Sequence, residues 1–279
     1  LSKPRTSTAE NTKISSYTQG NLTFRWLSRD ENMVDRNRIE YDVVIVGGGN
    51  AALCASLSAA HAGSKVLLME KAPRHLRGGN CPYTGGGFRF VHDGKNDLEP
   101  LLANPSSIQQ IPAIRPYTSE QYCQDMLTRT GQMTNPDLLN RLVADSYSTV
   151  RWLASLGISF ELSGSSRTGQ QGTPDSRVGV LASGSGLGLL NMLYKAAEQS
   201  GVIIVYDTKM ISLSENTLGE VNGVVCKDKE GRHTVMCRAV VLACGGCEAI
   251  QEMSIFKAGL TIDPTVVPQL VGAVPPRFF

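Results

Sequence analysis

Residues 41–52 read Tyr41-Asp42-Val43-Val44-Ile45-Val46-Gly47-Gly48-Gly49-Asn50-Ala51-Ala52, and the order of the following elements can be built outward from them. The apolar, β-branched run at 41–46 predicts a strand that is buried on both faces. The three glycines turn the chain into a helix of small residues over 50–61, which Gly63 ends. A second apolar run at 65–70 follows. The whole segment therefore predicts a βαβ unit.

The glycines have the spacing Gly47-x-Gly49-x-x-Ala52, and Glu70 ends the second strand 21 residues after Gly49. Gly47 permits a tight turn, Gly49 lets the backbone approach a pyrophosphate, and Ala52 keeps the helix close to the strand. The helix N-terminus offers unpaired N–H groups to phosphates, and Glu70 would accept hydrogen bonds from ribose hydroxyls. The motif predicts dinucleotide binding. The alternative is an ordinary glycine turn, with Glu70 solvated at the end of a strand.

Two further glycine-rich stretches distinguish FAD from NAD. Arg77-Gly78-Gly79-Asn80-Cys81-Pro82-Tyr83-Thr84-Gly85-Gly86-Gly87 resembles the GGNS…SGGG signature of the fumarate reductase and succinate dehydrogenase flavoprotein family. Ala243-Cys244-Gly245-Gly246 is similar to the Ala-Thr-Gly-Gly end of that family's second FAD-contacting strand. The resemblance covers roughly residues 41–250, and tricarballylate dehydrogenase-like members are the most similar branch.

The resemblance implies an α/β fold, a Rossmann-like FAD-binding domain of the glutathione-reductase type with a β-meander. It implies FAD as the cofactor. We expect this FAD to be non-covalent, because no histidine lies between His75 and His92 to form a histidyl linkage. The residues expected to contact FAD, by their positions in the family's motifs, are Gly47, Gly49, Asn50, Ala51, Glu70, Lys71, Gly78, Gly79, Asn80, Thr84, Gly85, Gly86, Met210, Ala243, Gly245 and Gly246.

The implied activity is that of an FAD-dependent dehydrogenase or reductase acting on a CH–CH bond of a carboxylate substrate, tricarballylate-like or fumarate- and succinate-like, with hydride passing to flavin N5. The electron acceptor is not indicated. In the family, the capping domain and the proton-donating arginine follow the Ala-Thr-Gly-Gly strand, so we expect them to be missing here and name no catalytic residue. One alternative is a catalytically inactive FAD-binding fragment or pseudoenzyme. Another is an NAD-dependent dehydrogenase, which leaves Gly78–Gly87 unexplained.

The domain organisation expected from the sequence has three parts: a flexible lead over 1–38, the FAD-binding domain over 39–250 with a helical insertion at about 117–160, and an unassigned tail over 251–279. Within it we expect loops over 71–116 and 161–186. The expected helices cover 119–130, 136–156 and 187–200. The expected strands cover 202–206, 210–214, 221–227, 233–237 and 239–243, the last one fully buried.

The net charge and the cysteine content limit the classes of function that the sequence allows. The net charge of the 279-residue chain is +2, which gives no electrostatic reason to expect nucleic acid or a membrane surface as a partner. The longest uncharged apolar run, 239–247, is about half of the roughly 20 residues that a membrane span requires. Seven cysteines at irregular spacing predict free thiols and favour a cytoplasmic location, with a mitochondrial one left open.

Two smaller features have competing interpretations. Cys244 and Cys247 form a CxxC pattern, which we interpret as substitutions in the glycine-rich strand end rather than as a dithiol or half of a zinc site, so no metal is expected. Arg89 and His92 follow the second glycine loop. They could face the substrate, or lie in a solvated loop.

Overall fold

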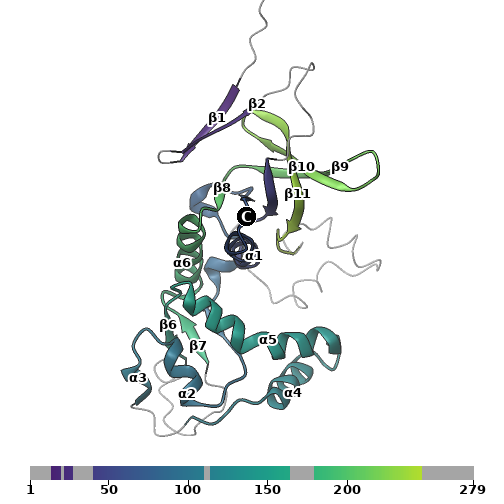
Figure 1. Cartoon of the computed structure of the whole chain (residues 1–279). Helices are drawn as coiled ribbons and strands as arrows, with labels where there is room; N and C mark the ends of the chain where they lie inside the picture. The colour runs from purple at the N-terminus through teal and green to yellow at the C-terminus, as the bar shows by residue number, and fades with distance from the viewer. Residues whose placement is uncertain (1–13, 20–21, 28–39, 110–113, 164–178, 247–279) are drawn as a thin grey trace, which may run out of the picture.

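The computed structural model describes residues 14–19, 22–27, 40–109, 114–163 and 179–246. Its largest sheet has six strands in the order β8-β4-β3-β11-β10-β9 (Figure 1). The strand bounds are β3 Tyr41–Val46, β4 Val66–Met69, β8 Ile203–Val205, β9 Lys209–Glu215, β10 Val221–Asp228 and β11 Gly231–Leu242.

The four strands β8, β4, β3 and β11 are parallel to their neighbours, and β9, β10 and the first half of β11 form an antiparallel meander. Counted along the chain, the parallel strands have the order 3-2-1-4, which is the order of a dinucleotide-binding half-sheet. The expected α/β fold with a β-meander is confirmed. The strand order reverses between β3 and β11, and ligands of such sheets bind beyond the carboxyl ends of the strands at this point.

Strand β3 is buried on both faces, as its sequence predicts. Ile45 belongs to a core cluster that also contains side chains of α1 (Asn50–His61) and α6 (Ser185–Gln199). Val44 and Val46 belong to a second cluster, formed with Val224 and other side chains of the meander. Because successive strand side chains point to opposite faces, helices cover one face of the sheet and the meander covers the other.

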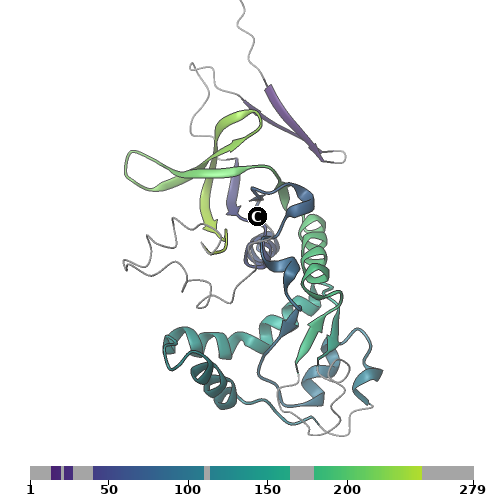
Figure 2. The same cartoon turned by 180° about the vertical axis from the view of Figure 1, so that it is seen from behind.

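The second part of the molecule lies below α6 in Figure 1, and also when seen from behind in Figure 2, and it carries helices and a small sheet. In the expected insertion, the capping box of Thr118 and Gln121 starts one helix and the Asn135 side chain caps the next. The elements of this part are β5 Gly87–Phe88, α2 Lys95–Leu98, α3 Ser106–Gln109, α4 Ser119–Arg129, α5 Pro136–Ser155, β6 Phe160–Leu162 and β7 Val180–Ala182, with a single 3₁₀ turn at Glu99–Leu101. Two further 3₁₀ turns, Arg74–Leu76 and Cys81–Tyr83, lie alongside α6.

The strands expected at 233–237 and 239–243 are one continuous strand, β11. Its first half pairs antiparallel with β10 and its second half pairs parallel with β3, so a single strand leaves the meander and enters the parallel sheet. The expectation that 239–243 is fully buried is wrong. Val241 is 36% exposed and Leu242 is 56% exposed, because the layers that cover β3 do not reach across the carboxyl end of β11.

The two segments that were expected to be loops contain regular structure. The segments 71–116 and 161–186, expected as loops, contain short helical turns and the three-stranded sheet β5-β7-β6. These strands have two or three residues, too few to show an alternating pattern. Two strands, β1 Ile14–Gln19 and β2 Leu22–Leu27, pair antiparallel within the expected flexible lead. The expected tail over 251–279 lies outside the described residues.

Candidate functional site

The carboxyl ends of β3 and β11 meet at two glycine turns. The N–H of Gly47 donates to the carbonyl of Met69 (2.8 Å), and the N–H of Ala243 donates to the carbonyl of Val46 (2.9 Å). Gly47 has a φ of +115°, and a Cβ there would collide with the carbonyl of Ala243. The two turns are therefore in direct contact, at the place where the reversal of strand order puts a ligand.

Helix α1 begins at the first glycine turn. Its N-cap residue is Gly49, which offers no side-chain cap, and no acidic residue lies in its first turn. The N–H of Asn50 donates to the sulfur of Cys81 (3.3 Å), and Asn50 Oδ1 is buried without a hydrogen-bond partner among the described residues. Ala51, next along the helix, is exposed. An uncapped helix N-terminus with a positive partial charge is an anion site.

Glu70 follows β4 directly and is 6% exposed. Its Oε1 accepts a hydrogen bond from the N–H of Ala72 (2.8 Å), and Oε2 lies so close to Gly48 that a Cβ at Gly48 would collide with it. Lys71, the next residue, is exposed. The structure thus brings the acidic residue of the motif against the first glycine turn.

The second glycine loop crosses the N-termini of α1 and α6. Gly78 is buried with a φ of +95°, and a Cβ there would meet the side chain of Leu190 on α6. At the far end of the loop, the N–H of Gly186 in α6 donates to the carbonyl of Thr84 (2.9 Å), and Gly86 packs against Ser185. The expected contact residues Gly79, Asn80, Thr84 and Gly85 are all exposed.

The remaining expected site residues occupy two places. Gly245, with a φ of +77°, and Gly246 are exposed just beyond β11. Met210 lies on β9, and its partly buried side chain packs against the cluster under the meander. The N–H of Thr208, two residues earlier, donates to the carbonyl of Glu70 (3.0 Å), so the start of β9 lies near the end of β4.

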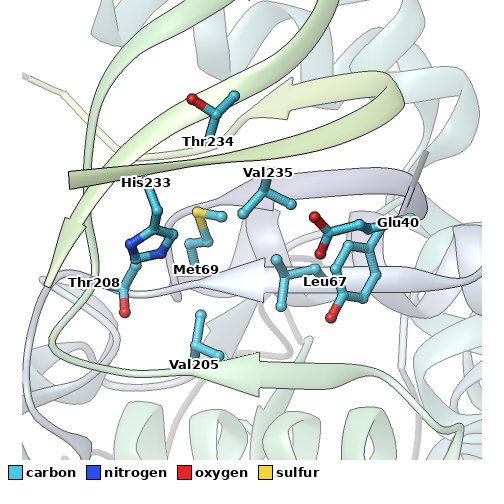
Figure 3. Close-up of a pocket in the computed structure, with 9 residues that line it drawn as sticks. Glu40, Leu67, Met69, Val205, Thr208, His233, Thr234 and Val235 are labelled. Atoms are coloured by element: carbon cyan, nitrogen blue, oxygen red, sulfur yellow. The ribbon is translucent and has the colours of Figure 1, made fainter. Parts of the chain in front are cut away.

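Two hollows lie in the described part of the chain, and neither is lined by the glycines that follow β3 and β11. A cavity of about 30 Å³ between the parallel strands and the meander is lined by Glu40, Met69, Thr208 and His233, among others (Figure 3). It has room for about one water molecule and cannot hold a nucleotide. A larger groove of about 250 Å³ lies between α6 and residues 74–77, with Pro82 and Tyr83 of the second glycine loop also in its wall.

Arg89 and His92 are engaged within the protein. The Arg89 guanidinium pairs with the carboxylate of Asp125 (3.3 Å), and His92 is 2% exposed, with its Nδ1 accepting from the N–H of Gly94 (3.1 Å). The expectation that they face a substrate or lie in a solvated loop is therefore wrong for His92. The backbone of His92 pairs with that of Tyr117, the residue at the start of the insertion.

The described cysteines are free thiols, and Cys247 lies outside the described residues. No group of three or more His, Cys, Asp or Glu side chains in the described ranges is arranged to hold a metal ion. Among the helices that the structure describes, none is long and apolar enough to cross a membrane.

Residues 42–273 match the family described as FAD binding domain. The chain belongs to this family. FAD is accordingly its cofactor, and the site fits that group. The start of α1, which has no side-chain cap from its N-cap residue, suits a diphosphate, and the orphaned Oδ1 of Asn50 is a buried acceptor without a donor among the described residues.

The chain is similar to curated proteins of the same family. It is 26% identical over 209 residues to the fumarate reductase (cytochrome) of Shewanella frigidimarina, covering 74% of this chain and 33% of that protein. It is 29% identical over 227 residues to the digoxin reductase of Eggerthella lenta, covering 78% of this chain and 38% of that protein. The chain thus spans about a third of the length of these relatives.

A solved structure has the same fold. The open conformation of a flavocytochrome c3 fumarate reductase superposes with a TM-score of 0.62 at 26% identity, over 81% of this chain and 36% of that chain. The FAD-binding fold and the fumarate reductase-like family that the sequence implies are both confirmed.

Two residues near the first glycine turn are not among those that the sequence motifs indicate. Tyr194 on α6 donates its hydroxyl to the carbonyl of Gly48 (2.9 Å), and the guanidinium of Arg77 lies 4.1 Å from the centre of the Tyr194 ring. Gly48 and Tyr194 are 146 residues apart, and a tyrosine on a helix gives no sequence signal of such a contact.

Proposed function

We propose that this chain forms the FAD-binding part of an oxidoreductase that adds or removes hydrogen across a carbon–carbon bond beside a carboxylate. The observation that carries the proposal is the contact of two glycine turns at the switch point of the sheet, beside the uncapped start of α1. The likeness to a fumarate reductase supports the carboxylate class.

We assign the site residues by their places in the fold. Gly47, Gly49, Asn50 and Ala51 would hold the diphosphate at the start of α1, and Glu70 with Lys71 would hold the adenosine ribose. The start of β9 with Met210 would contribute backbone groups to the adenine. The two loops that would follow the rest of the cofactor contain Gly78, Gly79, Asn80, Thr84, Gly85 and Gly86 in one case, and Ala243, Gly245 and Gly246 in the other.

The FAD in this proposal is non-covalent. When bound, it supplies an isoalloxazine ring that accepts or donates hydride. The protein would supply the positive end of helix α1 and backbone N–H groups for the phosphates. It would supply the buried carboxylate of Glu70 for the two hydroxyls of the adenosine ribose.

The first test is the visible absorption spectrum of the purified chain before and after acid precipitation. We expect flavin bands in the folded protein that move to the supernatant after precipitation. A folded, colourless protein that does not take up added FAD would contradict the assigned site, and flavin retained in the pellet would contradict non-covalent binding.

The second test concerns the substrate class. The bound flavin is reduced under anaerobic conditions and mixed with fumarate, and its reoxidation is followed by absorbance. Tricarballylate and succinate are added to the protein with oxidised flavin. A substrate is expected to reduce the flavin and so to bleach its visible absorption. Digoxin serves as the comparison substrate outside the carboxylate class, because a digoxin reductase is also similar to this chain. A response to digoxin without a response to any carboxylate would overturn the proposed class.

A second candidate is an FAD-binding protein without turnover. The observation that favours it is that Arg89 and His92, the candidates for substrate contact, are engaged by Asp125 and by the backbone of Gly94. Flavin binding without reaction with any substrate of the second test is the outcome that would select this candidate.

A further inference from the structure

Tyr194 is buried against the first glycine turn. Its side chain is 1% exposed, and its hydroxyl donates to the carbonyl of Gly48 at 2.9 Å. A Cβ at Gly48 would collide with this hydroxyl and with the carboxylate of Glu70, so glycine is required for helix α6 to approach so closely. A buried hydroxyl that has one backbone acceptor fixes the orientation of that carbonyl.

The carbonyl of Gly48 and the N–H of Gly49 belong to one planar peptide group. The peptide bonds of the described residues are all trans, so the two groups point in opposite directions. When Tyr194 holds the carbonyl toward α6, the N–H of Gly49 must point away from α6. Gly49 donates to no backbone carbonyl among the described residues, and it is the N-cap of α1. Its N–H is thus presented on the side where the helix start would receive an anion.

The hydroxyl of Tyr194 stays a donor over the physiological range. Burial raises its pKa well above the usual value, and the neighbouring Tyr206 and Glu70 raise it further. A phenolate, which could only accept a hydrogen bond, is therefore not formed beside the Gly48 carbonyl. The orientation of the turn does not depend on pH near neutrality.

The guanidinium of Arg77 packs over the ring of Tyr194. The guanidinium lies 4.1 Å from the ring centre and donates to Asn191 Oδ1 (3.1 Å) and to the hydroxyl of Tyr206 (3.4 Å). Arg77 immediately precedes Gly78, so this cation is also the start of the second glycine loop. One cluster of side chains therefore touches both of the loops that surround the start of α1.

We propose that Tyr194 is a positioning residue for the FAD diphosphate: its hydroxyl orients the Gly48–Gly49 peptide so that an N–H faces the phosphates, and Arg77 holds the tyrosine ring in place. This inference rests on the proposed function, since it concerns the same FAD site.

The test compares Tyr194→Phe with Tyr147→Phe. The hydroxyl of Tyr147, a residue of the insertion, also donates to a backbone carbonyl, that of Asp97 (3.2 Å). The dissociation constants of FAD, ADP and riboflavin are measured by titration of the apoprotein, with flavin fluorescence for FAD and riboflavin and calorimetry for ADP. ADP carries the diphosphate without the flavin, and riboflavin carries the flavin without phosphate.

We expect Tyr194→Phe to raise the dissociation constants of FAD and ADP about ten-fold, which corresponds to one lost hydrogen bond to a buried carbonyl. The constant for riboflavin and all constants of Tyr147→Phe should stay as in the parent. Arg77→Lys, which keeps the charge but loses the planar contact, should raise the ADP constant about three-fold.

The inference is overturned if Tyr194→Phe binds ADP as tightly as the parent, or if riboflavin is weakened as much as ADP. Thermal unfolding of the apoproteins distinguishes a purely structural role of Tyr194 from a role in FAD binding. A purely structural role would lower the melting temperature and leave the dissociation constant of ADP for the folded fraction unchanged. If the parent protein binds neither FAD nor ADP, the proposed function itself fails.

Discussion

The carboxylate of Glu70 is held in place before any ligand binds. One oxygen accepts from the N–H of Ala72, and the residue is 6% exposed, so its orientation is fixed by its own backbone neighbour and by Gly48. Glu70→Ala removes the acceptor for ribose hydroxyls. A hydrogen bond to a charged group is worth about 1.5–3 kcal/mol, so FAD affinity should fall about ten- to a hundred-fold.

Titration of the apoprotein with FAD measures this effect, and Glu161→Ala is the matched control because Glu161 is exposed on β6. Equal affinity of Glu70→Ala and the parent would show that the acidic residue of the motif has been assigned to the wrong position.

Cys81 occupies the space beside the first turn of α1. Its sulfur lies 3.3 Å from the N–H of Asn50, and a Cβ at Gly49 would also come within 3.3 Å of it. We expect Cys81→Ser to change the FAD dissociation constant less than about three-fold, because the hydroxyl is small and accepts the same hydrogen bond. Cys81→Leu should reduce flavin content strongly, since the larger side chain would fill the approach to the helix start.

Flavin content per folded protein, from absorbance after purification, checks both variants. Cys123→Ser, in the insertion, controls for thiol loss. Full flavin content in Cys81→Leu would place the diphosphate elsewhere.

At the scale of elements, the turn between β3 and α1 requires glycine both for its positive φ and for the close approach of Ala243. Gly47 has a φ of +115° and abuts the carbonyl of Ala243, whereas Gly63, which ends α1, has a φ of +83° with open space around it. Gly63→Ala should therefore cost only backbone strain, about 1–2 kcal/mol. Gly47→Ala should cost about 3 kcal/mol or more, because strain and overpacking add.

Chemical denaturation of both variants gives the comparison, and their flavin content gives a second one. Gly63→Ala should keep its flavin and Gly47→Ala should lose it. A similar loss of stability in both variants would mean that the two glycine turns are not in contact.

At the scale of the whole molecule, buried thiols and phenols make stability depend on pH. Burial raises the pKa of Cys54 from 9.0 to about 11 and that of Cys226 from 9.0 to about 12, and burial raises the pKa of Tyr41 and Tyr117 from 10.0 to about 12. Because the folded state binds these protons more tightly than the unfolded state, the stabilisation is complete below about pH 9 and is lost as pH rises toward 12.

The urea midpoint should therefore fall steadily from about pH 9 to pH 11. Cys226→Ala should be less stable at neutral pH but should have a smaller slope over this window, since one titrating group is gone. A slope equal to that of the parent would show that Cys226 is not protonated more tightly in the folded state.

The sequence by itself determined the first βαβ unit. The expected helix over 50–61 is α1 (Asn50–His61), and the expected strand over 41–46 is β3 (Tyr41–Val46). Such elements follow from neighbouring residues, namely an apolar run, a glycine turn and a row of alanines, so no distant contact is needed to recognise them. The glycine spacing and Glu70 predicted a nucleotide site for the same reason.

The tertiary structure decided which distant segments meet. The single strand β11 leaves the meander for the parallel sheet, and this places Ala243 against Gly47. The hydroxyl of Tyr194 reaches Gly48 across 146 residues, and pairing with Tyr117 buries His92. Periodicity shows which face of an element is apolar but not which partner covers it, because the partner is selected by strand order and helix packing over the whole chain.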